Sequence, residues 1–180
     1  MKKFFIIPFL VFMSVCTKSQ SLKNTSYKND NGEKVLRLEI SLPVNLPAAW
    51  KLFTIDSQLQ KWIAPLAHID LKTGGYIITN YDAKKILTDS SSIKLPIVSF
   101  LKEELLILKV VLNNYFSKTV REQGEHLQEI IQFKKLDENN TLIISSMVGW
   151  GTGNEWDKTY DFFVMGNEYT YKELLKNYKK

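Results

Sequence analysis

The chain has 180 residues, of which 44% are hydrophobic and 24% charged, and its formal net charge is +5 at pH 7. This length and composition suit one globular domain with a full core, and they exclude a disordered or fibrous chain. Three of the lysines lie among the first 19 residues, so the remainder carries about +2. The other lysine pairs are scattered along the sequence, which does not favour a nucleic-acid-binding protein.

The first 19 residues have the layout of a secretory signal peptide. Two lysines precede an apolar run over residues 4–15, and small and polar residues follow it. The run is shorter than the roughly 20 apolar residues of a transmembrane helix, so we expect no stable membrane span. We therefore predict that residues 1–19 are a signal peptide, cleaved after Ser19 or Ser21, and that the protein is exported, either periplasmic or secreted.

Cys16 is the single cysteine of the sequence, and it stands at the end of the apolar run. A lipoprotein signal places its lipid-bearing cysteine there, but it also requires a small residue just before it, where this chain has Val15. Lipoprotein anchoring through Cys16 is therefore the minor alternative. Cleavage after Cys16 leaves a mature chain without cysteine and so without a disulfide framework.

Local patterns predict a flexible polar lead-in at 20–32 and then an α+β domain over residues 33–180. Apolar and polar residues alternate from 33 to 44, which is typical of a half-buried strand. A short helix at 47–53 follows, and a second at 56–63 has Asp56 or Ser57 as its predicted cap.

The middle of the chain then alternates as β-structure. About six antiparallel strands are predicted, with a turn at Gly74-Gly75, a loop at 82–92 and a hairpin turn at 102–104. The segment 113–123 fits either a loop or a helical turn. The predicted strands are 67–71, 76–81, 93–101, 105–112, 125–136 and 141–148.

The last segment predicts one long helix from Asn154 to Tyr178. A glycine-rich turn at 149–153 precedes it, and Asn154 is its predicted cap. Acidic residues at its start and lysines at its end suit the helix dipole. At 1.5 Å per residue such a helix is about 36 Å long and can cross a whole sheet. The residues that recur along one face are Trp156, Tyr160, Phe163, Asn167, Tyr171, Leu174 and Tyr178.

Three stretches give the sequence a resemblance to a known superfamily. They are VNLPAAWKLFT at 44–54 with LQKWIAP at 59–65, IDLKTGG at 69–75, and GWGTGNEWD at 149–157 with the aromatic residues that follow. Together with the order of elements, they resemble the START-like, or helix-grip, superfamily, also called SRPBCC. Within it they are similar to the branch named for the C-terminal domain of the activator of the heat-shock-protein-ninety ATPase. The likeness covers about residues 33–178.

The resemblance implies a curved antiparallel sheet with two short helices and one long C-terminal helix, which leave an apolar cavity between sheet and helix. Members of the superfamily bind lipids, sterols or other apolar molecules; some are cyclases and others are co-chaperones. An exported chain would meet neither cytosolic heat-shock ATPases nor ATP, so the co-chaperone role is not the first expectation. A shared fold does not fix an activity.

The implied cavity gives a set of candidate ligand-binding residues, most of them on the long helix. An aromatic stripe is more often plain core packing, so each residue has that second interpretation. For the amide of Asn167 the alternative is a hydrogen bond to a neighbouring strand or to internal water. The candidate cavity-lining residues are Trp62, Trp156, Tyr160, Phe163, Asn167 and Tyr171.

No catalytic set of residues is apparent in the sequence. It contains neither a Gly-x-Ser-x-Gly elbow nor a nucleotide-binding fingerprint, and His68 and His126 are far apart, so we expect no metal and no cofactor. Acid–base chemistry in the cavity would need an inward acidic or phenolic group. Glu39, Glu129 and Tyr160 are the candidates for that role.

Three hypotheses on function follow. The first is a non-catalytic carrier or sensor of a small apolar molecule or lipid. The second is a cyclase- or hydrolase-type enzyme that uses polar residues of the same cavity, and two converging ionisable side chains would favour it. The third is a co-chaperone-like module that binds a protein partner through an exposed apolar patch. The sequence does not predict the oligomeric state.

Overall fold

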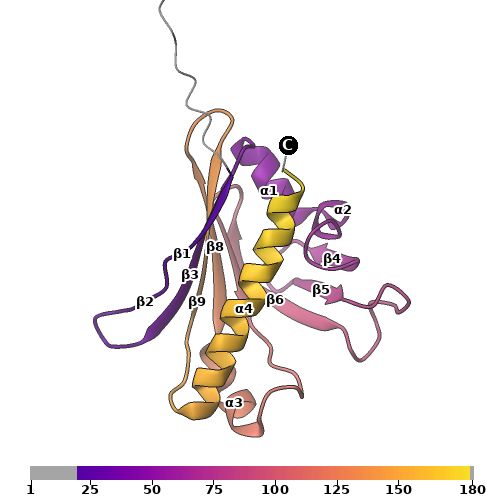
Figure 1. Cartoon of the computed structure of the whole chain (residues 1–180). Coiled ribbons are helices and arrows are strands. Elements are labelled where there is room, and N and C mark those ends of the chain that lie inside the picture. Colours follow the sequence, from indigo (N-terminus) through magenta and orange to yellow (C-terminus); the bar gives the residue numbers. More distant parts are fainter. Residues whose placement is uncertain (1–19, 179–180) are drawn as a thin grey trace, which may run out of the picture.

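One curved antiparallel sheet and a long C-terminal helix form most of the molecule (Figure 1). The computed structural model describes residues 20–178, so the predicted signal peptide, with Cys16, lies outside the described residues. In that range nine strands form the sheet, in the order β1-β3-β9-β8-β7-β6-β5-β4, and β2 pairs with β3 beside this path. No helix among the same residues is long and apolar enough to span a membrane.

The elements follow the predicted order of a strand, two short helices, antiparallel strands and a long helix, which confirms the α+β fold class. The helices are α1 (Leu46–Thr54), α2 (Asp56–Leu59), α3 (Lys118–Gln123), the 3₁₀ turn η1 (Gly124–His126) and α4 (Asn154–Lys176). The strands are β1 (Ser21–Asn24), β2 (Tyr27–Lys28), β3 (Lys34–Leu42), β4 (Leu66–Asp70), β5 (Tyr76–Asn80), β6 (Ile93–Leu101), β7 (Leu105–Lys109), β8 (Gln128–Lys135) and β9 (Thr141–Val148).

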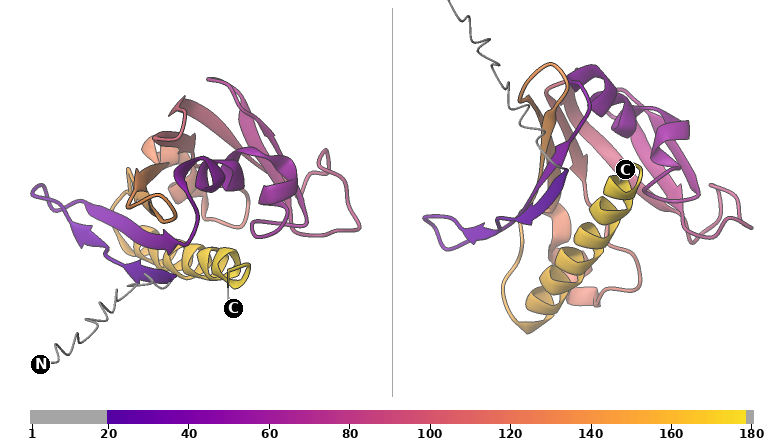
Figure 2. Two further views of the ribbon diagram at one scale, coloured as in Figure 1. Left: turned by 90° about the horizontal axis from the view of Figure 1, so that it is seen from above. Right: turned by 45° about the horizontal axis from the view of Figure 1, so that its top comes forward.

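The core lies between the concave face of the sheet and α4. Strand β3 shows how the alternating pattern produces it, because Leu36, Leu38 and Ile40 are fully buried while the polar residues between them stay partly exposed. Burying each such side chain contributes about 1.5–3 kcal/mol. The helix crosses this face from the α3 end of the sheet to the α1 end, as Figure 1 and the right view of Figure 2 show.

The predicted flexible lead-in at 20–32 is wrong. Strand β1 pairs with β3, with Ser21 opposite Ser41, and β2 pairs with the start of β3. The alternating-apolar signal is absent there because these strands lie at the sheet edge and are largely exposed. Their pairing rests on backbone hydrogen bonds, which do not depend on apolar side chains.

The two short helices begin in different ways. Asn45 caps α1, because its side-chain oxygen accepts a hydrogen bond from the Ala48 N–H at 2.9 Å. The predicted cap of α2 is wrong, since the residue before the helix is Ile55 and no side chain caps the helix start. Asp56 instead accepts a hydrogen bond from the Ile69 N–H at 2.9 Å, which ties α2 to β4.

The long helix begins at Asn154 and ends at Lys176, and at 1.5 Å per residue it is about 34 Å long. Asn154 is its first helical residue rather than its cap, because Gly153 precedes the helix with φ +99° and no side chain bonds to its first turn. The turn before it requires glycine at 149. The φ angle there is +85°, and a Cβ atom would lie 2.0 Å from the carbonyl oxygen of His126.

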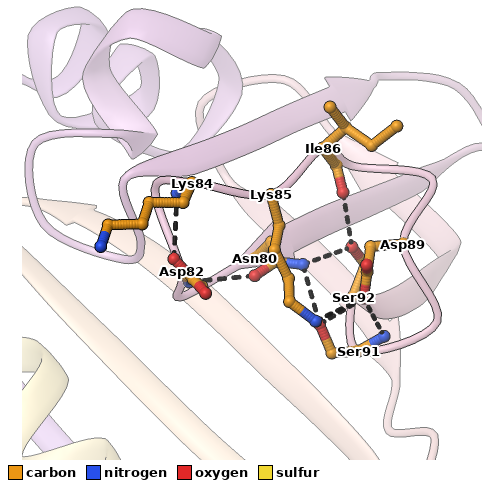
Figure 3. Close-up of polar contacts among 8 residues, drawn as sticks. All are labelled: Asn80, Asp82, Lys84, Lys85, Ile86, Asp89, Ser91 and Ser92. Atoms are coloured by element: carbon orange, nitrogen blue, oxygen red, sulfur yellow. Dashed lines mark hydrogen bonds and ion pairs between the residues drawn. The ribbon is translucent and has the colours of Figure 1, made fainter.

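The loop at 82–92 is held by a network of polar side chains, shown in Figure 3. Asn80, which is buried at the end of β5, donates from Nδ2 to the hydroxyls of Ser91 and Ser92 at 3.1 and 3.0 Å. The Asp89 carboxylate accepts hydrogen bonds from the backbone and the hydroxyl of Ser91. The loop therefore has a defined conformation between β5 and β6.

Candidate ligand-binding cavity

A cavity of about 320 Å³ lies between the sheet and α4. Its volume falls at the lower end of the range of small-molecule sites, and most of its lining is aliphatic or aromatic. The residues around it come from α1 (Phe53), the turn after α2 (Trp62, Ile63), β5 to β7 with their adjoining loops (Ile77, Thr79, Tyr81, Ile93, Leu95, Leu108, Val110, Val111, Asn113, Tyr115, Phe116), β8 and β9 (Glu129, Ile131, Met147) and α4 (Phe162, Phe163, Gly166, Asn167, Thr170, Tyr171).

Three aromatic rings form the wall nearest the two short helices. The Trp62 ring stacks on Tyr171 at 5.7 Å and meets Phe53 edge-on at 4.8 Å. The indole N–H of Trp62 donates to the carbonyl oxygen of Leu52 at 3.0 Å. Stacked and edge-to-face pairs are favourable geometries for aromatic rings, so these contacts stabilise the wall.

Exposed aromatic residues mark the side on which the cavity meets solvent. Tyr115 is 74% exposed and packs against Phe162 of α4 with ring centres 5.2 Å apart. Next to them the Phe116 ring stacks on Phe163 at 5.6 Å. The segment 113–123, which fitted either a loop or a helical turn, contains both: residues 113–117 form a loop that joins α4 at the rim, and α3 follows.

The floor of the cavity carries one carboxyl group, that of Glu129 on β8. Its Oε1 accepts hydrogen bonds from the Ser145 hydroxyl at 2.7 Å and from the Tyr171 hydroxyl at 3.2 Å. Glu129 points to the concave face because it alternates in step with the buried Ile131. Strand β9 and helix α4 therefore both position this carboxyl group.

Burial dominates the electrostatics of this group. It raises the pKa of Glu129, against the lowering effect of the two hydroxyl hydrogen bonds. Among the described lining residues there is no lysine, arginine or histidine to stabilise the ionised form. The pKa of Tyr171 is raised well above its usual value by burial and by the neighbouring Glu129.

Four of the six candidate ligand-binding residues line the cavity, namely Trp62, Phe163, Asn167 and Tyr171. The amide of Asn167 donates to the sulfur of Met147 on β9 at 3.1 Å, so it bonds to a neighbouring strand. Sulfur is a weak acceptor.

The other two candidates, Trp156 and Tyr160, do not line the cavity, and that part of the prediction is wrong. Trp156 is 2% exposed and donates to the Gln123 side chain at 2.8 Å. Tyr160 packs edge-on against Trp150, with the Lys34 ammonium 4.7 Å from its ring. Trp156 and Phe163, seven residues apart, differ in direction by only about 20° on the helix, so the packing opposite each ring decides which of them borders the cavity.

The three acid–base candidates differ in whether they line the cavity. Glu39 forms an ion pair with Arg37 at 2.5 Å on β3, and neither it nor Tyr160 lines the cavity. Glu129 is the candidate that lies in it. Ser145 and Met147 were not predicted from the sequence. The signal for them was that they alternate along β9 in step with the buried Ile143, so that their side chains point to the same face. Within residues 20–178 no three His, Cys, Asp or Glu side chains gather as metal ligands would.

No protein-family model and no curated protein matches the sequence. Solved structures do match. The Aha1 dimer of Colwellia psychrerythraea has a TM-score of 0.58 at 13% identity, over 79% of this chain and 91% of that one. Protein MLL2253 of Mesorhizobium loti has a TM-score of 0.61 at 10% identity, over 79% of this chain and 94% of that one. Protein NE0264 of Nitrosomonas europaea has a TM-score of 0.58 at 20% identity, over 81% of this chain and 96% of that one.

The chain has the START-like, helix-grip fold. The curved nine-stranded sheet in the described residues and the long C-terminal helix match these neighbours, and the Aha1 structure is among them, as the resemblance in the sequence predicted. At such identities the likeness concerns the START-like fold alone, and it carries no activity with it.

Proposed function

We propose that this protein binds a small, mainly apolar molecule in the cavity between the sheet and α4, as a non-catalytic carrier or sensor. The observation that supports this is the cavity itself, about 320 Å³ and bordered by residues of the hydrophobic core. Protein interiors contain few voids larger than a water molecule, so a space of this size with an apolar lining suits a ligand.

A blocking variant tests the proposal. Gly166 lies on α4 beside the cavity, and a Cβ atom there would meet nothing within 4 Å. Gly166→Phe adds a large ring at the edge of this space, whereas Gly166→Ala adds one methyl group and serves as the matched control. We expect the neutral fluorophore N-phenyl-1-naphthylamine to bind the wild type and the alanine variant, and to bind the phenylalanine variant at least tenfold more weakly.

Equal binding by all three proteins, or binding by none, would contradict the proposal. Native mass spectrometry of the protein purified from its own host provides an independent test. We expect it to show a bound apolar molecule that is absent from Gly166→Phe prepared in the same way.

An enzyme is the second candidate, because two ionisable side chains converge in the cavity. The hydroxyl of Tyr171 lies 3.2 Å from Oε1 of Glu129, and both residues line the space. A cyclase- or hydrolase-type reaction could use such a pair for proton transfer. Turnover of a recovered ligand by the wild type, lost in Tyr171→Phe with ligand affinity retained, would favour this candidate over the carrier.

We also propose that residues 1–19 direct export. Strand β1 begins at Ser21, so cleavage after Ser19 leaves every residue of that strand in place, whereas cleavage after Ser21 removes one residue of its pairing with β3. The intact mass of the protein from its own host should correspond to a chain that begins at Gln20. A lipid-modified Cys16 would support the anchored alternative, and an uncleaved chain would contradict export.

A further inference from the structure

The two oxygens of the Glu129 carboxyl group have different surroundings. Oε1 accepts both hydroxyl hydrogen bonds, from Ser145 at 2.7 Å and from Tyr171 at 3.2 Å. No described residue bonds to Oε2. No side-chain oxygen or nitrogen in the described residues is both fully buried and without a partner, so Oε2 keeps exposed surface, and it faces the cavity that Glu129 lines.

This asymmetry fixes where a proton on the carboxyl group resides. Oε1 is the acceptor for two donors, so the proton of the neutral acid belongs on Oε2. An ionised carboxylate would lie in an apolar space without a cation among the described lining residues, which is costly. Burial accordingly favours the neutral acid.

The supporting residues hold this geometry in place. Tyr171 is 3% exposed, and its ring stacks on Trp62. Ser145 is fully buried on β9, where it faces Ile131 across the β8–β9 pair. Both hydroxyl donors therefore come from a strand and a helix, and no described residue bonds to Oε2, which leaves this oxygen free to contact a ligand.

We propose that Glu129 donates a hydrogen bond from Oε2 to an uncharged oxygen of the ligand, so that the cavity selects apolar molecules that carry a carbonyl or hydroxyl group. This inference rests on the proposed function and deepens it. A carboxylate ligand finds no described cation in the cavity, and an amine cation requires Glu129 to ionise first.

Three ligands with the same apolar body test the choice of polar group. They are 2-acetylnaphthalene, which has a carbonyl, 2-ethylnaphthalene, which has none, and 1-(2-naphthyl)ethylamine, which is a cation at neutral pH. Each is titrated against the bound fluorophore. A net hydrogen bond is worth about 1 kcal/mol, so we expect the ketone to bind roughly fivefold to tenfold more tightly than the hydrocarbon, and the amine most weakly.

Two variants at position 129 separate hydrogen bonding from charge. Glu129→Gln retains an acceptor for the two hydroxyls and directs an N–H donor into the cavity, so it should keep the preference for the ketone. Glu129→Leu should bind ketone and hydrocarbon equally. Hydrocarbon binding is the internal control for a folded cavity in both variants.

The pH dependence gives a further readout. The titratable groups that face Glu129 are Tyr171 on α4 and Tyr81 after β5, and burial raises the pKa of each above the usual tyrosine value. Both stay neutral while Glu129 titrates. The ketone preference of the wild type should therefore fall as pH rises through the pKa of Glu129, while that of Glu129→Gln stays flat.

The outcomes are distinguishable. Equal binding of ketone and hydrocarbon by the wild type would overturn the role of Glu129 and leave the cavity proposal standing. Tightest binding of the amine, lost in Glu129→Gln, would overturn it in favour of an ion pair. Failure of all three ligands and of the fluorophore to bind would overturn the proposed function and this inference with it.

Discussion

The inner face of α4 has two regions that the sequence does not distinguish. At its start Trp156 is almost completely enclosed, in part because a glycine leaves room for it: a Cβ at Gly151 would lie 2.1 Å from its Nε1. Further along, Phe163 and Tyr171 face a cavity. Aromatic content is similar in both regions. What differs is whether other residues fill the space next to the ring, as they do at Trp156 and do not at Phe163 and Tyr171.

The largest expected effect is a truncation in the packed region. Trp156→Ala should lower the free energy of unfolding by about 3–5 kcal/mol, because it removes a fully buried ring and its hydrogen bond to Gln123. Phe163→Ala should cost less than half as much, since that ring is partly exposed and already borders a space. Urea denaturation followed by circular dichroism measures both. Similar losses at the two positions would mean that the cavity is collapsed in solution.

A second comparison adds one methyl group in the packed region, at Gly151, and one beside the cavity, at Gly166. Gly151→Ala should destabilise the protein by roughly 1–3 kcal/mol, because its Cβ overlaps the indole of Trp156. Gly166→Ala should stabilise it by up to about 1 kcal/mol, because alanine has the higher helix propensity and its Cβ meets nothing within 4 Å. Thermal unfolding of the two variants side by side measures the difference. If Gly166→Ala destabilised the protein, the space next to Gly166 would be filled in solution.

Glu129 makes the cavity region sensitive to pH. Its pKa is raised in the folded state, so the folded protein binds this proton more tightly than the unfolded chain does. The stability of the wild type relative to Glu129→Gln should be greatest below the ordinary glutamate value of 4.5 and should fall as pH rises from there to the pKa of the folded state. The slope is at most about 1.4 kcal/mol per pH unit. Parallel curves for the two proteins in urea titrations would refute a buried, neutral Glu129.

The smallest effect concerns the loop at 82–92, which joins two cavity-lining residues, Tyr81 and Ile93. The backbone hydrogen bond from Ser91 lowers the pKa of Asp89 to about 2, with its hydroxyl and Lys85 as further causes. The loop should therefore keep its order above the ordinary value of 3.8 and lose it as pH falls towards about 2. Asp89→Asn should show faster hydrogen exchange of the loop amides at neutral pH, with little change in global stability. Unchanged exchange would mean that Asn80 alone holds the loop.

The sequence determined the elements whose signals are local. Such signals come from side chains that are close together along the chain, so they can be recognised without knowledge of the fold. Examples are the alternation of β3, the β6–β7 hairpin and the helical periodicity of α4. Glycine-rich turn residues at 149–153 likewise marked the start of α4. These signals, with the resemblance they supported, were sufficient for the helix-grip fold and for four of the cavity-lining residues.

Tertiary structure alone decided the features that depend on residues far apart in the sequence. Residues 21–24, three of which are polar, became a strand because the edge of β3 pairs with their backbone. Asp56 bonds to β4 instead of capping its own helix, since folding brings Ile69 to it. The stripe on α4 divides into packed and cavity-facing parts because the neighbours of each ring come from distant segments, such as Gln123 beside Trp156 and Trp62 beside Tyr171.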